Sequence, residues 1–85
     1  MQTLYLDADL YATSRELHAA LKRLLDLPDY YGMNADALSD CLGERAEPLH
    51  VYVATPGRGE VARTVQLLMQ VVEDAGGTVR HAVQL

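Results

Sequence analysis

The sequence has only one cysteine, Cys41, and neither tryptophan nor phenylalanine among its 85 residues. A single cysteine excludes an internal disulfide, which is typical of proteins in a reducing compartment. The sequence also has no apolar run of about 20 residues, the length that a helix needs to cross a bilayer. Its first residues lack the basic and apolar regions of a signal peptide. We therefore expect a cytoplasmic protein that makes no membrane contact.

The length and composition are those of a small globular protein. Hydrophobic residues make up 49% of the chain and charged residues 22%, which excludes a disordered chain or a fibrous repeat. A chain of 85 residues has room for one hydrophobic core and not for a second. We expect a single domain over residues 1–85.

The net charge of −5 is confined to one segment of the chain, residues 26–47. Acidic and basic residues cancel in residues 1–25 and again in residues 48–85. The segment between them sets six acidic residues against Arg45 alone: Asp26, Asp29, Asp36, Asp40, Glu44 and Glu47. Such a local field repels phosphate backbones and speeds association with a basic partner. We therefore predict no direct binding of nucleic acid.

Hydrophobic periodicity predicts a strand and a helix in the first part of the chain. Residues 3–8 contain three large apolar side chains in succession, which indicates a short strand buried on both faces. Thr13 and Glu16 have the spacing of a capping box, and apolar residues then recur every three or four positions, as in a helix. Pro28 should end this helix, because proline disfavours a helical conformation in the residue before it.

The rest of the chain continues the alternation of helices and strands. Residues 29–33 are predicted to form a loop, and Asn34 is a good N-cap for a helix that runs to about Leu42, with Gly43 as its C-cap. Strands separated by helices indicate the α/β class, with a parallel sheet and right-handed crossovers. A second strand, a third helix and a third strand are predicted at residues 49–54, 59–75 and 78–85.

Asp36 and Asp40 are the first candidates for a functional site. They are four residues apart, so they lie on one face of the second helix, where like charges cost roughly 0.2 to 0.5 kcal/mol. Taken alone, the pair also fits an ordinary solvated helix surface. Tyr30 and Tyr31 both have the character of core aromatics. We expect Tyr31 to be buried and Tyr30 to face outward.

The remaining reactive side chains predict neither a catalytic thiol nor a metal site. Cys41 is expected to be a small buried hydrophobic residue, with acidic neighbours that raise the pKa of its thiol. His18, His50 and His81 lie on three different predicted elements without the spacing of metal ligands. We expect these histidines on the surface or along the strands, and we predict no cofactor.

Residues 27–42 carry a specific motif, LPDYYGMNADALSDCL. Its tyrosine pair, glycine, asparagine and two acids, at these offsets, resemble the barstar family of intracellular ribonuclease inhibitors. The resemblance implies a small three-stranded parallel sheet packed by three to four helices. It also implies a binding protein rather than an enzyme, monomeric when free. The second helix and the loop before it would plug the active site of a secreted or toxin-type basic ribonuclease.

Matched position by position, the resemblance implies roles for individual side chains. Asp40 matches the family's central acid, which occupies the place of a substrate phosphate, and Asp36 matches the second acid of the helix. Tyr30 matches a loop tyrosine that packs against the enzyme. Ser39 stands where the family usually has a large aromatic residue, and Val71 stands where some members have an acid. The implied partner-binding residues are Tyr30, Gly32, Asn34, Asp36, Ser39, Asp40, Gly43 and Glu44.

Two other functions stay open on the sequence alone. The same fold could serve as a protein-binding module for another basic nuclease toxin or another basic protein. Alternatively, Asp36 and Asp40 could be the paired carboxylates of a small acid-dependent or metal-binding hydrolase. The hydrolase is less favoured, because two acids on one exposed helix lack the nucleophile, base and oxyanion donors of a catalytic site.

Overall fold

The computed structural model describes residues 2–82 and shows an α/β fold. Its elements are β1 (Gln2–Asp7), the short 3-10 helix η1 (Ala8–Leu10), α1 (Ser14–Leu24), α2 (Ala35–Gly43), β2 (Leu49–Thr55), α3 (Gly59–Asp74) and β3 (Thr78–His81). The predicted fold class is confirmed, with three parallel strands and three α-helices where three to four helices were expected. Residues 83–85 of the third predicted strand lie outside the described residues.

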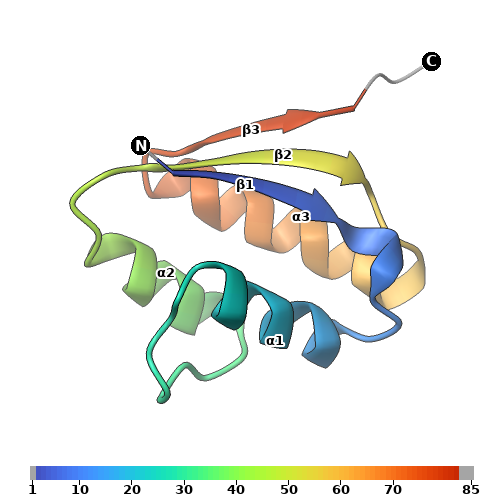
Figure 1. Cartoon of the computed structure of the whole chain (residues 1–85), viewed down its shortest axis with the longest axis horizontal. Coiled ribbons are helices and arrows are strands. Elements are labelled where there is room, and N and C mark those ends of the chain that lie inside the picture. Colours follow the sequence, from blue (N-terminus) through green and yellow to red (C-terminus); the bar gives the residue numbers. More distant parts are fainter. Residues whose placement is uncertain (1, 83–85) are drawn as a thin grey trace.

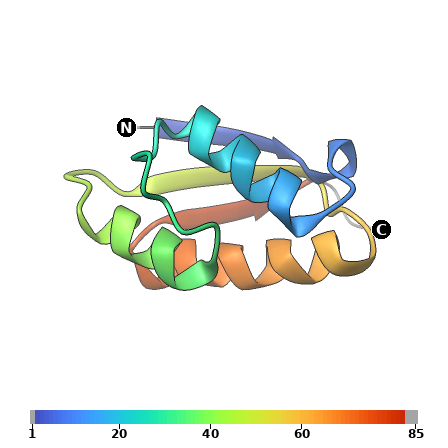
Figure 2. The ribbon, with the colours of Figure 1, turned by 90° about the horizontal axis from the view of Figure 1, so that it is seen from below.

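The three strands form one parallel sheet in the order β1-β2-β3. Leu4 of β1 is paired with Val51 of β2, which is paired in turn with Val79 of β3. Each crossover adds the next strand on the same side, and right-handed crossovers of this kind place their helices on one face of the sheet. Figures 1 and 2 show α1, α2 and α3 together on that face.

The hydrophobic core fills the space between the sheet and the three helices. Leu6 and Val53 enter it from the strands, and Leu17, Leu38 and Leu68 enter it from the helices, each with at most 2% of its surface exposed. The helical periodicity of the sequence therefore identifies the inward faces correctly. None of the described helices combines the length and the apolar composition of a membrane span.

The prediction that β1 is buried on both faces is wrong. Its side chains alternate, with Leu4 and Leu6 buried and Tyr5 72% exposed. The reason is that all three helices cover the same face, so the described chain leaves the other face of the sheet open to solvent. There the Tyr5 ring packs at 5.9 Å against the ring of Tyr52 on β2, which explains an aromatic residue at an exposed position.

Helix α1 begins as predicted and ends before Pro28 for a different reason. The Thr13 hydroxyl accepts the N–H of Glu16 at 3.1 Å, and this cap fixes the start of the helix. At the other end Asp26 adopts the left-handed conformation, with φ of 53°. The N–H of Leu27 then donates to the carbonyl of Lys22 at 2.9 Å, which is the Schellman pattern of a helix end. The chain leaves α1 toward the loop that precedes α2.

Candidate functional site

The start of α2 is fixed by Asn34, as predicted. Its Oδ1 accepts the N–H of Ala37 at 2.8 Å, and its Nδ2 donates to the carbonyl of Gly32 at 3.1 Å. A β-carbon on Gly32 would lie 3.4 Å from both the Ala37 side chain and Nδ2 of Asn34. The loop therefore passes within van der Waals contact of the first turn of the helix at this point. One side chain thus joins the loop and the helix into a single rigid unit.

Tyr31 also anchors the loop before α2, through a buried contact with α1. Its hydroxyl lies 2.7 Å from Nδ1 of His18 on α1, and only 5% of Tyr31 is exposed. The neighbouring Tyr30 is 79% exposed, so the predicted division between a buried and an outward tyrosine is confirmed. The buried Tyr31 therefore holds the backbone that presents Tyr30 to solvent.

The expectation that His18 lies on the surface is wrong, because only 4% of the residue is exposed. His18 precedes the buried Leu21 by three residues and Leu25 by seven, so it lies on the inward stripe of α1. That spacing was the signal in the sequence that could have identified it. The missing information was its partner, Tyr31, which lies thirteen residues further along the chain.

Burial keeps both members of this contact uncharged. It lowers the pKa of His18 from the usual histidine value, because the charged imidazolium is poorly solvated there. Burial raises the pKa of Tyr31 to about 12, and the nearby Cys41 adds to the effect. The 2.7 Å contact is therefore a hydrogen bond between a neutral imidazole and a neutral phenol near neutral pH.

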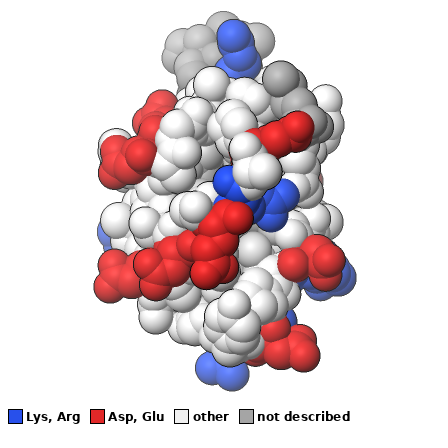
Figure 3. Space-filling model, turned by 90° about the vertical axis from the view of Figure 1, so that its left-hand side faces the viewer, with Lys and Arg blue, Asp and Glu red and all other residues white. Residues whose placement is uncertain are grey.

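Three carboxylates follow one another along the outer side of α2. Asp36, Asp40 and Glu44 are each four residues apart and exposed, while Leu38 and Cys41 on the other side are buried. Figure 3 views the molecule from the side on which α2 lies and shows a band of acidic side chains there, with basic side chains next to one end of it. We call these three residues the acidic row. A partner that approaches this side meets the carboxylates directly.

No described side chain forms an ion pair with the acidic row. Within residues 2–82, Asp36, Asp40 and Glu44 take part in no ion pair and no side-chain hydrogen bond. By contrast, Asp29 of the preceding loop has a cation nearby, because its carboxylate lies 3.9 Å from Nζ of Lys22. The charges of the row are therefore available to groups outside the chain.

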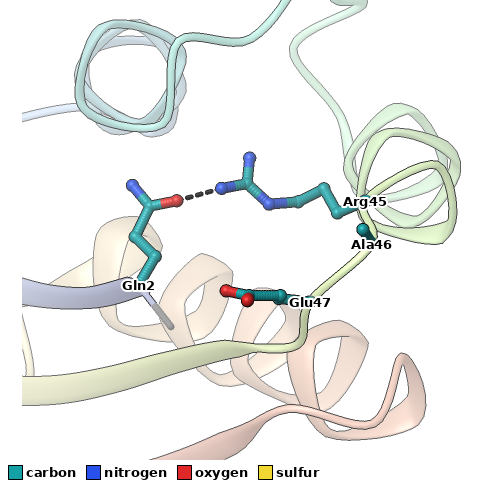
Figure 4. Close-up of a pocket in the computed structure, with 4 residues that line it drawn as sticks. All are labelled: Gln2, Arg45, Ala46 and Glu47. Carbon is teal, nitrogen blue, oxygen red and sulfur yellow. Dashed lines mark hydrogen bonds between the residues drawn. The ribbon is translucent and has the colours of Figure 1, made fainter.

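Arg45, the single basic residue of residues 26–47, forms its hydrogen bonds with other parts of the chain and not with the acidic row. One guanidinium nitrogen donates to the carbonyl of Leu25 at 3.3 Å, and another donates to Oε1 of Gln2. Figure 4 shows Arg45 extended toward Gln2, away from α2. Together with Ala46 and Glu47, these two side chains line a pocket of about 460 Å³. Arg45 thus connects the end of α2 to α1 and β1 and leaves the acidic row unpaired.

The end of α2 differs from the prediction by one residue. Gly43, expected as the C-cap, is the last residue of the helix, and Glu44 occupies the cap with φ of −87° and ψ of −8°. A β-carbon on Gly43 would meet nothing within 4 Å, so the isolated fold does not require glycine there. Because Glu44 keeps a helical conformation, its carboxylate continues the row that Asp36 and Asp40 begin.

Part of the predicted site gathers around one hollow, which we call the notch. It has a volume of about 410 Å³. Four predicted residues line it, namely Tyr30, Gly32, Asp40 and Glu44, together with Tyr31, Ala37 and Cys41. Asn34 lines a different hollow on the other side of the loop. The remaining predicted residues, Asp36, Ser39 and Gly43, are exposed and line neither of these two hollows.

Cys41 is the buried hydrophobic residue that the sequence predicted. Burial raises the pKa of its thiol, the carboxylates of Glu44 and Asp40 raise it further, and Arg45 acts in the opposite direction. A thiol in this environment stays protonated and is a poor nucleophile. Within residues 2–82, no group of three or more histidine, cysteine or acidic side chains is arranged to hold a metal ion.

Comparison with known proteins gives two findings. The family model described as "Barstar (barnase inhibitor)" matches residues 1–83. A curated relative, the "Putative ribonuclease inhibitor YrdF" of Bacillus subtilis (strain 168), is 48% identical to this chain over 42 residues. That alignment covers 49% of this chain and 46% of the relative, so it spans about half of each protein.

Proposed function

This chain belongs to the Barstar (barnase inhibitor) family, and from that premise we propose that it inhibits a small basic ribonuclease by covering the active site of the enzyme. The covering surface is the loop before α2 together with the outer side of α2. The observation that supports this proposal best is the acidic row, whose three carboxylates are exposed and unpaired within the described chain. The protein acts by binding, in the cytoplasm of the cell that makes it, and not by catalysis.

The chemistry of ribonucleases explains why carboxylates suit this task. Such an enzyme gathers cationic side chains around the phosphate that it cleaves, and a carboxylate offers a guanidinium the same pair of acceptor oxygens as a phosphate. Asp40 is the proposed central acid, because it matches the family's central acid in position and lines the notch together with the exposed Tyr30. Asp36 is the second acid, one helical turn away on the same side of α2.

The other predicted residues shape the surface around these two acids. Tyr30 offers an exposed ring against which the enzyme packs, and Gly32 and Asn34 hold the loop that carries it. Ser39 has a small exposed side chain and Gly43 has none, so the backbone of a partner approaches the helix there without obstruction. Glu44 extends the negative surface past the end of the helix.

Rigidity of the loop supports tight binding. The hydrogen bonds of Asn34 to Gly32 and Ala37, and the contact between Tyr31 and His18, fix the loop before any partner arrives. A preformed binding surface loses less conformational entropy on association than a flexible one. The free chain is proposed to be monomeric and to form a one-to-one complex with a secreted or toxin-type ribonuclease.

The experiment that tests this function is an RNA-cleavage assay with a panel of small secreted basic ribonucleases, of which barnase is the first. We expect one equivalent of the protein to stop cleavage by at least one enzyme, and calorimetry to give a stoichiometry near one. The association rate should fall as salt is added, because attraction between exposed charges is screened at a distance of about 10 Å in 0.1 M salt. Full cleavage by every enzyme in the presence of excess protein contradicts the proposal.

A further inference from the structure

A second hollow lies on the other side of Asn34 from the notch, and we call it the apolar groove. It has a volume of about 310 Å³ and runs between α1, the loop before α2 and α3. Figure 2 shows the end of that loop next to the middle of α3. The side chains that give the groove its apolar character are Met33, Ala35, Leu67 and Leu68.

Two apolar side chains that line the apolar groove are partly exposed to solvent. Leu67 of α3 is 55% exposed, and Met33 is only partly buried against the core. A single exposed leucine is ordinary on a protein surface. Leu67, however, lines the same hollow as the partly buried Met33 and the N-cap residue Asn34, which belongs to the proposed binding surface. The groove is therefore continuous with the surface that the ribonuclease is proposed to cover.

The acidic row alone makes an incomplete interface. Protein interfaces of standard size bury about 800 Å² on each partner and have an apolar centre inside a polar rim. The outer side of α2 presents Asp36, Ser39, Asp40 and Glu44, all of which are polar or charged. Apolar area for such an interface is available from Tyr30 on one side of the helix start and from the apolar groove on the other.

We propose that the apolar groove receives an apolar side chain of the same ribonuclease, an inference that rests on the proposed function. The charge of the residues that line the groove indicates which groups of the ribonuclease surround that apolar side chain. Arg15 is the single formally charged residue among the described residues that line the groove. The partner's apolar side chain therefore lies next to neutral or acidic groups. In contrast, the part of the ribonuclease that faces the acidic row is basic.

The test compares two leucines that are both exposed in the free protein. Leu67→Gln removes the apolar contact and keeps a good helix-forming residue at that position. Leu10→Gln makes the same change in η1, where Leu10 is 70% exposed and lies at the other end of the sheet from α2. Circular dichroism and thermal unfolding confirm that both variants keep the fold. Binding is measured by surface plasmon resonance with barnase, or with whichever enzyme of the panel is inhibited.

We expect Leu67→Gln to weaken binding about tenfold, which corresponds to burial of most of one leucine side chain, and mainly through faster dissociation. Leu10→Gln should bind within about twofold of the parent. Asp40→Ala is measured in parallel. If Asp40→Ala loses affinity while Leu67→Gln binds like the parent, the groove inference is wrong and the proposed function stands. If Asp40→Ala and Leu67→Gln both bind like the parent, the proposed function is wrong as well.

Discussion

Helices α1 and α2 begin in the same way, with a side-chain oxygen that accepts a backbone N–H group. Thr13 does this for α1 and Asn34 for α2. Their last turns differ. α1 ends with Lys22 and Arg23, whose positive charges oppose the negative end of the helix dipole, whereas α2 has no basic residue there and carries Asp40 in its last turn and Glu44 at its cap. The basic residues at the end of α1 therefore stabilise that helix, whereas the acidic residues at the end of α2 destabilise it.

The size of these effects shows why the fold tolerates the arrangement in α2. A carboxylate at the wrong end of a helix costs roughly 0.3 to 1 kcal/mol, and a like-charge pair four residues apart costs roughly 0.2 to 0.5 kcal/mol. These costs are small beside the 5 to 15 kcal/mol by which folded domains are typically stable. The acidic row therefore lowers stability only slightly, while it leaves three unpaired charges for a partner. The following variants test this difference between the two helices.

The largest effect is expected when a charge is removed from the end of α2 or of α1. Removal from α2 should weaken binding and stabilise the fold, whereas removal from α1 should only destabilise the fold. Asp40→Ala should cost about 2 to 5 kcal/mol of binding, a range set by other complexes, the barnase and barstar pair of this family among them. The same change should stabilise the free protein by a few tenths of a kcal/mol, because it relieves repulsion along α2. Titration calorimetry and urea unfolding measure the two quantities.

The control for this variant is Arg23→Ala, which removes an exposed charge from the last turn of α1. It should destabilise the protein by roughly 0.3 to 1 kcal/mol and leave binding unchanged. A loss of binding in Arg23→Ala as large as that in Asp40→Ala would contradict the division of roles between the two helices.

The next effect concerns the contact that joins α1 to the loop before α2. Tyr31→Phe removes the hydroxyl and leaves Nδ1 of the buried His18 without its partner. An unsatisfied buried polar group costs about 1 to 3 kcal/mol, so urea unfolding should show a loss of stability in this range. Tyr30→Phe makes the same change on an exposed ring and should stay within about 0.5 kcal/mol of the parent. Equal stabilities for the two variants would show that the buried hydrogen bond contributes nothing.

Much of this architecture was predictable from local patterns in the sequence. The caps at Thr13 and Asn34 and the spacing of apolar residues predict where the helices begin and which sides face inward, because these signals depend on neighbouring residues alone. The acidic row was predictable in part for the same reason, since a spacing of four residues places Asp36 and Asp40 on one side of any helix.

The features that the sequence did not predict depend on residues far apart in the chain. The buried His18 is paired with Tyr31, and the exposure of Tyr5 follows from the placement of all three helices on one face of the sheet. The direction of Arg45 is set by Leu25 and Gln2, which lie 20 and 43 residues away. Local periodicity holds no information about such partners. The notch and the apolar groove are likewise products of the way that the loop packs on the helices.

A smaller effect is expected when the end of α2 is made similar to the end of α1. Glu44→Lys replaces a carboxylate by a cation at the helix end, which should stabilise the free protein by roughly 0.3 to 1 kcal/mol. Glu44→Gln, which only removes the charge, should give a smaller gain. Both are measured by urea unfolding at low salt, and the gain from the lysine should shrink in 1 M salt. A lysine variant that is less stable than the parent would show that Glu44 supports the fold, contrary to its unpaired position.

The smallest effect is a pH dependence of stability that arises from the buried side of α1. Because burial lowers the pKa of His18, the unfolded chain binds the histidine proton more tightly than the folded protein. Stability from this group is therefore fully present above about pH 6.5, the unperturbed histidine pKa, and is lost as the pH falls through the lower pKa of the folded state. Urea unfolding between about pH 5 and pH 8 should show this decline in the parent protein.

The decline should be reduced in His18→Gln and retained in His81→Gln, which changes an exposed histidine of β3. An unchanged decline in His18→Gln would assign the pH dependence to other groups.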